Sequence, residues 1–416
     1  MSIVCNNTFA YHYWGNNILI YKTLHEFVSL PQLHTDIVDL IANYDLDYES
    51  LYNALCSKYS VDTEDAQIHQ AYVKVISKLM AAGYIFENKT HNKKKITGTK
   101  GLFYPFSIVV EITDKCNLRC KHCYRDTKQH NFREMNMDEF RDLCKTFKGK
   151  TPNLILTGGE ITTNSDIVEM IGIASTDFCL YILSNGIALS NIPLSTIRKI
   201  KFAQLSVYGF DDDSFYNFTN VHNGLLGFEK GVQLIQKANI DYLITLMITR
   251  SNKSIIEKYI TYLIKLKVKR IAFGINSPIG KICKGNKNMF LTNSEREEVV
   301  NTIKNLENKY SHQILFMPYS SIASLEFSTK NQPYSKGDFS CSAGKTNVII
   351  DPYGNVRPCH MMPTSLFNEY NFRKYGKDLE NCISPNYKSE IVAFGKYLEA
   401  NSHSYKDMNC VGFCNL

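Results

Sequence analysis

The sequence lacks the features that mark membrane-bound, secreted and disordered chains. No apolar run approaches the ~18 residues that a transmembrane helix requires. The first residues, MSIVCNNTFAYHYWGNN, hold no basic stretch before an apolar core, so we expect no signal peptide and a cytoplasmic protein. Internal repeats and long low-complexity tracts are absent as well. With 44% hydrophobic and 21% charged residues among 416, the composition is that of a globular protein with room for two or three domains.

A strong charge of one sign is also missing. The sequence has 47 Lys and Arg residues against 40 Asp and Glu residues, a net charge of +7. A dedicated nucleic-acid binder carries a denser basic footprint. We therefore expect neither a membrane nor a nucleic-acid partner, although the mild positive charge permits an acidic one.

Cysteine, by contrast, is abundant. The chain has 13 cysteines, an odd number, whereas a secreted disulfide framework usually shows an even number and a signal peptide. In a reducing compartment, clustered cysteines more often bind metal or take part in chemistry. Their spacing therefore carries the most information about function.

Residues 1–90 have the pattern of a small winged-helix-like module. The segment TFAYHYWGNNILIY alternates around the turn Gly15-Asn16-Asn17, which is typical of a β-hairpin. Three helical patterns follow, with apolar residues three and four apart, and Tyr84-Ile85-Phe86 predicts a closing strand. Residues 91–105 are polar, include the basic run Lys93–Lys95, and are interpreted as a linker.

Expected strands and helices alternate over residues 106–325, which predicts a parallel sheet with helices outside it. Six βα units are too few for an eight-stranded barrel, so we predict an α/β fold with a partial (β/α)6 barrel. Functional residues in such folds lie at the carboxyl ends of the strands. The expected strands are 106–113, 153–157, 180–183, 202–207, 242–249 and 270–275, and the clearest helical patterns are 137–147, 227–237 and 255–266.

Three cysteines follow the first of these strands. Cys116, Cys120 and Cys123 have the spacing C-x₃-C-x₂-C on one loop. Three thiolates can hold three irons of a 4Fe–4S cluster and leave the fourth iron open to a small molecule. The spacing alone also permits a structural zinc with a distant fourth ligand, or cysteines that bind nothing. Zinc sites, however, favour paired C-x₂-C or mixed Cys/His ligands.

Together with motifs further along the chain, this loop resembles the radical S-adenosylmethionine (radical SAM) superfamily. Gly158-Gly159-Glu160 ends the second expected strand and is similar to the family's GGE motif. Ser184-Asn185-Gly186 ends the third, where the family often has Thr-Asn-Gly. Gln204-Leu-Ser206-Val-Tyr208-Gly209 ends the fourth and resembles Gln-x-Ser-x-Asp-Gly. The order of the motifs along the strands matches the family.

The resemblance implies specific roles. It implies that Cys116, Cys120 and Cys123 hold a catalytic 4Fe–4S cluster, reduced by a donor such as flavodoxin or ferredoxin. It also implies a 5′-deoxyadenosyl radical, made from S-adenosylmethionine, that abstracts hydrogen from carbon. Two positions depart from the family pattern: Ile161 stands where Pro is common and Tyr208 where Asp is common. The cofactor-binding residues implied are Tyr124, Gly158, Gly159, Glu160, Ser184, Asn185, Ser206 and Arg250.

Residues 326–416 contain few periodic segments and are expected to form a small cysteine-rich domain. Cys341, then a strand, then Gly354-x₄-Cys359 resembles the start of the SPASM extension of peptide-modifying radical SAM enzymes, and Cys410-x₃-Cys414 resembles its later element. The pair of cysteines that precedes this later element in the family is missing. The resemblance therefore implies a shortened domain with one auxiliary 4Fe–4S cluster. Its expected ligands are Cys341, Cys359, Cys410 and Cys414, with Cys382 as an alternative to Cys410.

The N-terminal module completes the functional prediction. A hairpin with three helices before a radical SAM barrel resembles a peptide recognition element of ribosomal peptide biosynthesis, which binds a leader peptide as an added strand. The resemblance therefore implies a maturase of a ribosomally made precursor peptide, with a Cys thioether crosslink as the favoured product. Alternatives are a peptide epimerase, a carbon–carbon crosslinking enzyme, an RNA-modifying enzyme and a sulfatase-activating type.

Overall fold

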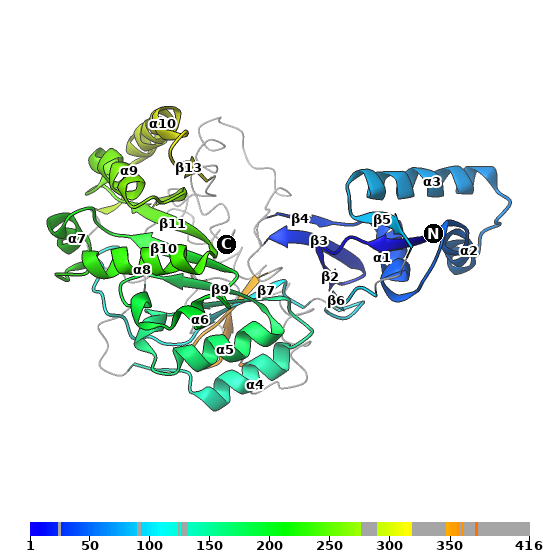
Figure 1. The fold of residues 1–416 in the computed structure, drawn as a ribbon, viewed down its shortest axis with the longest axis horizontal. Coiled ribbons are helices and arrows are strands. Elements are labelled where there is room, and N and C mark those ends of the chain that lie inside the picture. Colours follow the sequence, from blue (N-terminus) through cyan, green and yellow to red (C-terminus); the bar gives the residue numbers. More distant parts are fainter. Residues whose placement is uncertain are drawn as a thin grey trace, which may run out of the picture. The chain divides into compact units, whose positions relative to one another are not determined.

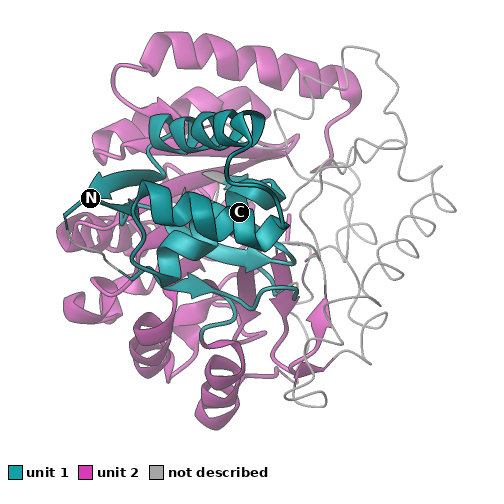
Figure 2. Ribbon diagram, turned by 90° about the vertical axis from the view of Figure 1, so that its right-hand side faces the viewer, with its two compact units in different colours: residues 1–106, 149–152, 416 teal, residues 107–148, 153–415 magenta. Residues whose placement is uncertain are grey.

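The computed structural model describes residues 1–23, 26–89, 93–102, 104–123, 125, 132–275, 289–317, 347–357, 360 and 371–372. The chain divides into two compact units (Figure 2). Unit 1 comprises residues 1–106 with residues 149–152, and unit 2 comprises residues 107–148 and those from 153 onward. Among the described helices, none is long and apolar enough to cross a membrane.

Unit 1 contains two small sheets and three helices (Figure 1). Four strands pair in the order β4-β3-β2-β6, and β1 pairs with β5 in a separate antiparallel sheet. The predicted hairpin is confirmed as β2 and β3, and the closing strand as β5. The strands are Ser2–Cys5 (β1), Ala10–Trp14 (β2), Asn17–Thr23 (β3), Glu26–Ser29 (β4), Ile85–Asn88 (β5) and Ile96–Thr97 (β6), and the helices are Gln32–Asn43 (α1), Tyr48–Tyr59 (α2) and Ala66–Ala81 (α3).

Local sequence signals explain where these helices begin and end. The side chain of Asp47 accepts a hydrogen bond from the Ser50 amide at the start of α2, and that of Asp65 accepts from two amides at the start of α3. Ser60 ends α2 in the left-handed conformation, and Gly83 follows α3 with φ +72°. The apolar faces of the helices meet the sheets in a core of their own.

The segment interpreted as a linker, residues 91–105, is instead partly built into unit 1. Its residues 96–97 form β6, which pairs in parallel with β2. The Lys94 amide donates to the Ala42 carbonyl, and Lys100 pairs with Asp36 and Asp39 of α1. The polar composition of this segment suggested a linker. Composition carries no information about pairing between segments 85 residues apart.

Unit 2 is built on a nine-stranded sheet. The strand order is β13-β12-β11-β10-β9-β8-β7-β14-β15. Neighbouring strands are parallel, except that β15 is antiparallel to β14. The six expected barrel strands are confirmed, and β8, β10 and β12 match to the residue. The strands are Ser107–Glu111 (β7), Asn153–Thr157 (β8), Cys179–Ser184 (β9), Phe202–Val207 (β10), Asp241–Ile248 (β11), Arg270–Ile275 (β12), Leu315–Phe316 (β13), Asn347–Ile350 (β14) and Val356–Arg357 (β15).

Helices alternate with these strands along the chain, as a partial barrel requires. A capping box formed by Asn136 and Glu139 starts α4, and a second formed by Thr292 and Glu295 starts α10. The helices are Met137–Phe147 (α4), Ile167–Asp177 (α5), Leu194–Ile197 (α6), Asp212–Thr219 (α7), Leu225–Ala238 (α8), Ile256–Lys265 (α9) and Asn293–Tyr310 (α10).

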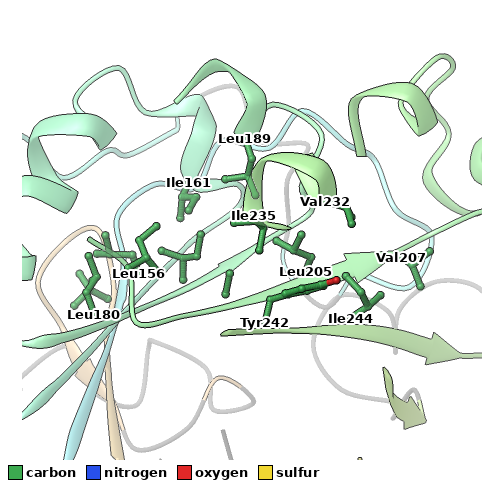
Figure 3. Packing of buried hydrophobic residues seen from close by; sticks show 14 of the residues in the cluster. Leu156, Ile161, Leu180, Leu189, Leu205, Val207, Val232, Ile235, Tyr242 and Ile244 are labelled. Atoms are coloured by element: carbon green, nitrogen blue, oxygen red, sulfur yellow. The ribbon is translucent and has the colours of Figure 1, made fainter. Parts of the chain in front are cut away.

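The two faces of the sheet differ in chemistry because side chains alternate along each strand. One face is apolar and packs against the helices. In Figure 3, Val232 and Ile235 of α8 lie against Leu205 of β10 and Ile244 of β11. The opposite face carries polar groups such as Ser107, Glu111, Asn153, Gln204 and Thr245. The polar side chains of the sheet thus gather on the face that points away from these helices.

The C-terminal part of the chain contributes to the barrel sheet itself. Residues 347–357 form the hairpin β14–β15, and β14 pairs in parallel with β7. The strand expected between Cys341 and Gly354 is present as β14, but its hairpin extends the barrel sheet and belongs to unit 2. The domain boundary expected at residue 326 therefore does not separate this hairpin from the barrel.

Candidate active site

The three cysteines of the C-x₃-C-x₂-C motif lie on the loop that follows β7. We refer to residues 112–125 as the cysteine loop. Its backbone is held by α7: the Arg119 amide donates to the Thr219 carbonyl, and the Lys121 amide donates to the Phe218 carbonyl. Asn220 adds a side-chain bond from Nδ2 to the Arg119 carbonyl at 3.0 Å. The loop is thus positioned by another part of the barrel.

The three thiols are partly buried and influence one another electrostatically. Burial raises the pKa of Cys116 to about 11 and that of Cys120 well above its usual value. Negative charge on Cys123 raises both pKa values further. Three thiolates that influence one another in this way need a compensating positive charge, which the irons of a cluster would supply.

A single metal ion fits these thiols less well than a cluster. Among the described residues, no group of three or more His, Cys, Asp or Glu side chains converges closely enough to hold one ion. A 4Fe–4S cluster presents a separate iron to each thiolate, so its ligands do not have to meet at one point. The donor set of three cysteines on one loop fits such a cluster better than a zinc ion.

Two glycines at the end of β8 allow that strand to approach the cysteine loop. The Gly159 amide donates to the Thr113 carbonyl at 2.7 Å, and the next amide donates to the Lys115 carbonyl at 2.8 Å. A Cβ atom on Gly159 would lie 2.0 Å from the Lys115 carbonyl oxygen, and one on Gly158 would lie 2.5 Å from that of Thr113. Any side chain at either position would push the cysteine loop away.

The carboxylate of Glu160 connects the ends of β8 and β9. It accepts hydrogen bonds from the Ser184 hydroxyl and the Asn185 amide, both at 2.7 Å, and from the Thr162 hydroxyl at 2.9 Å. Asn185 Nδ2 donates in turn to Asn117 Oδ1 of the cysteine loop at 2.6 Å. Burial raises the pKa of Glu160, and these donors oppose that shift. The cysteine loop and the motifs at the ends of β8 and β9 therefore form one hydrogen-bonded network.

An aromatic cluster lies beside the cysteine loop. The rings of His122, Tyr208 and Phe218 have centroids 4.5–5.9 Å apart. Burial lowers the pKa of His122 to about 4, so the ring is neutral, and Ser206 hydrogen-bonds to the Tyr208 hydroxyl. Tyr208 is also close enough to the three thiols for their charge to raise its pKa. A Tyr in place of the Asp common in the family thus presents a neutral hydroxyl toward the cysteines.

Arg250, expected to bind the cofactor, is paired within the protein. Its guanidinium donates to both carboxylate oxygens of Glu295 at 2.9–3.0 Å. Arg250 lines a cavity of about 660 Å³ together with Lys121 of the cysteine loop and Asp211 after β10. A carboxylate ligand would therefore share or replace Glu295 as the partner of Arg250.

Several expected site residues lie outside the described residues. They are Tyr124, which follows the third motif cysteine, and all four expected auxiliary ligands, Cys341, Cys359, Cys410 and Cys414. The alternative ligand Cys382 lies outside them too.

One buried carboxylate beside the cysteine loop, that of Glu111, was not predicted from the sequence. Glu111, at the end of β7, is buried and lies 2.9 Å from Arg125 Nη1, 2.7 Å from Arg357 Nη2 and 3.0 Å from His360 Nδ1. The two arginines and the histidine hold its pKa far below its usual value against the effect of burial. Glu111 is visible in the sequence immediately before the motif, but nothing in the spacing points to partners almost 250 residues away.

Comparison with known proteins identifies the class. Residues 110–263 match the family model described as the Radical SAM superfamily, and this range contains the cysteine motif and all the cofactor-binding residues implied by the resemblance. The chain therefore contains a radical SAM domain over these residues. Membership of this class implies a 4Fe–4S cluster and S-adenosylmethionine.

The relatives and solved structures are diverse. The chain is 22% identical over 329 residues to the "Antilisterial bacteriocin subtilosin biosynthesis protein AlbA" of Bacillus subtilis, covering 76% of this chain and 68% of AlbA. It is 24% identical over 297 residues to an "AdoMet-dependent heme synthase" of Methanosarcina barkeri, covering 66% and 83%. For two other curated relatives, the match with this chain covers only 63% and 41% of the relative's length. These matches leave the substrate to be proposed.

The fold is shared with a solved structure, Streptococcus suis SuiB bound to the precursor peptide SuiA. The TM-score is 0.66 at 14% sequence identity, and the alignment covers 93% of this chain and 90% of SuiB. This likeness supports the overall fold, including the parallel sheet of unit 2.

Proposed function

We propose that this enzyme is a maturase that modifies a ribosomally made peptide by radical chemistry. Cys116, Cys120 and Cys123 would hold the 4Fe–4S cluster, and S-adenosylmethionine would bind across the ends of β8, β9, β10 and β11. When bound, these groups supply reductive cleavage of the sulfonium C–S bond and a 5′-deoxyadenosyl radical that takes hydrogen from carbon. The observation that carries the proposal is the cysteine loop, which is hydrogen-bonded to Gly159 and Glu160 at the end of the neighbouring strand.

The protein's own residues would position these groups. Gly158 and Gly159 let the end of β8 lie against the cysteine loop, and Tyr124 is proposed as a further cofactor-binding residue. Glu160 fixes the turn that contains Ser184 and Asn185, whose backbone and side chains would face the cofactor. Ser206 would contact it from β10, and Arg250 would bind its carboxylate in competition with Glu295.

A peptide substrate is supported by the relatives and by unit 1. AlbA is named for bacteriocin biosynthesis, and SuiB was solved with a precursor peptide. In unit 1, β4 lies at one edge of its sheet, where main-chain groups can pair with an added strand. A cavity of about 450 Å³, lined by apolar residues such as Leu55, Tyr59 and Ile68, could take side chains of a leader peptide.

The proposed product is a thioether between a cysteine sulfur and a peptide carbon. Forming it removes two hydrogen atoms, so a second electron must be accepted. The shortened SPASM-like segment, with an auxiliary 4Fe–4S cluster on Cys341, Cys359, Cys410 and Cys414, would accept that electron or bind the peptide thiolate. Epimerisation or carbon–carbon crosslinking of the peptide is the alternative within the same class.

The first test measures iron, sulfide and 5′-deoxyadenosine in anaerobically reconstituted protein. The wild type is compared with a variant in which Cys116, Cys120 and Cys123 are all replaced by Ala. We expect about eight irons to fall to about four, with loss of 5′-deoxyadenosine formation. About four irons falling to none would remove the auxiliary cluster from the proposal. Zinc without iron, and no 5′-deoxyadenosine, would refute the catalytic site.

The second test identifies the substrate. Short peptides encoded beside the gene are co-produced with the enzyme and examined by mass spectrometry. Loss of two hydrogen atoms supports a crosslink, and alkylation of cysteine then distinguishes a thioether from a carbon–carbon bond. A peptide whose mass is unchanged in ordinary water but increases through deuterium uptake in heavy water indicates epimerisation. If no neighbouring peptide is altered while 5′-deoxyadenosine still forms, the peptide substrate is wrong and the radical chemistry stands.

A further inference from the structure

The carboxylate of Glu111 lies between two segments that are far apart in the sequence. From the cysteine loop, Arg125 reaches it with Nη1 at 2.9 Å. From the hairpin β14–β15, Arg357 places Nη2 2.7 Å from both carboxylate oxygens, and His360 places Nδ1 at 3.0 Å. One buried side chain therefore contacts both segments.

The charges in this cluster make the contacts strongly interdependent. Glu111 is fully buried, and the side chain of Arg357 is only 9% exposed. Arg125 also donates to Asp114 Oδ1 at 2.5 Å, within the same loop. A buried ion that loses its partner loses the interaction that offset its desolvation. Movement of either segment would thus leave a buried charge without its main partner.

The residues that contact Glu111 lie close to cysteines in the sequence. Arg125 is two residues after Cys123, and Arg357 and His360 flank Cys359 on both sides. The backbone supports the same link, because β7 and β14 are paired from Ser107–Asn347 to Val110–Ile350. The ion cluster therefore adds side-chain contacts between the hairpin and the end of β7 to this backbone pairing.

We infer that Glu111 is a positioning residue that fixes the cysteine loop and the hairpin β14–β15 relative to each other. It acts through Arg125 on one side and through Arg357 and His360 on the other. The inference rests on the proposed function only for the identity of the groups that these segments hold, namely the catalytic and the auxiliary cluster. The mutual positioning itself rests on the contacts of Glu111.

The test uses hydrogen–deuterium exchange of the full-length reconstituted protein. We expect Glu111→Gln to speed exchange about 10-fold or more in both residues 116–125 and residues 347–360, and to leave β10 and β11 unchanged. The matched control is Glu134→Gln. Glu134 binds Lys115 and Thr113 of the cysteine loop, and its described contacts do not include the hairpin. This control should alter exchange in the cysteine loop alone.

A reciprocal variant keeps the test decisive if Glu111→Gln does not fold. Arg357→Gln changes only the hairpin, yet we expect faster exchange in residues 116–125. In the reconstituted enzyme it should also change the electron paramagnetic resonance signal of the cluster bound to Cys116, Cys120 and Cys123. Faster exchange confined to one segment would overturn the inference. Protein that shows coupled exchange but binds no iron would support the positioning role and refute the proposed function.

Discussion

Replacement of Gly159 by Ala should test the close contact between β8 and the cysteine loop. The added Cβ atom would lie 2.0 Å from the Lys115 carbonyl oxygen and 2.8 Å from that of Asp114. Both neighbours are backbone atoms, so they cannot turn aside as a flexible side chain would. Ordinary contacts begin at 3.4 Å, so the cysteine loop must retreat by about 1.4 Å.

The magnitude follows from what this retreat breaks. The amides of Gly159 and Glu160 donate to the Thr113 and Lys115 carbonyls at 2.7 and 2.8 Å. Losing both bonds costs about 1–3 kcal/mol of stability. Because a displacement of about 1 Å at a reacting centre costs about 100-fold in rate, we expect a decrease of that order in 5′-deoxyadenosine formation.

The assay measures the rate of 5′-deoxyadenosine formation by reconstituted protein, together with iron content and thermal unfolding. Gly172→Ala is the matched control. It lies inside α5, where, among the described residues outside that helix backbone, an added Cβ would meet Lys199 Nζ at 3.8 Å and nothing closer. That variant should keep wild-type activity and gain up to about 1 kcal/mol of helix stability. If Gly159→Ala keeps a rate within about threefold of wild type, the argument from close approach is refuted.

Two further predictions concern buried polar groups. Burial lowers the pKa of His12 to about 4, below the unfolded value of about 6.5, so unit 1 should lose about 2 kcal/mol of stability as pH falls from 7 to 5. Because Trp14 is the single tryptophan of the chain, its fluorescence during urea unfolding reports on the stability of unit 1. If that stability depends on pH equally in the wild type and in His12→Gln, the prediction is contradicted. Glu160→Gln should cost about 1–3 kcal/mol and raise the KM for S-adenosylmethionine, because a donor replaces one acceptor facing Ser184 and Asn185. Unchanged thermal stability and KM would show that the Glu160 network does not depend on charge.

The barrel strands could be predicted from the sequence because their signals are local. β8, β10 and β12 are short apolar segments between helical patterns, and α4 begins at the capping box of Asn136 and Glu139. The site motifs were recognisable for the same reason, since each follows a strand within a few residues. Their placement at one end of a parallel sheet then follows from the topology.

Contacts between distant segments could not be predicted in this way. The segment Asn347–Ile350 looks like any short apolar strand, and nothing in it indicates pairing with β7. The ion pair of Arg250 joins residues 45 apart, and the cluster around Glu111 joins residues almost 250 apart. β6 has two residues, too few to give a periodic pattern. These features depend on the tertiary fold.

The pairing of β14 with β7 has a consequence for how the protein is made. Ser107 and its partner Asn347 are separated by 240 residues, which a ribosome needs roughly 10–50 s to add. During that interval the first strand of the barrel has one open edge, and Glu111 has only Arg125 among its two arginine partners. An open strand edge invites pairing with other chains. The nascent barrel is therefore exposed to misassembly at this edge until the hairpin emerges.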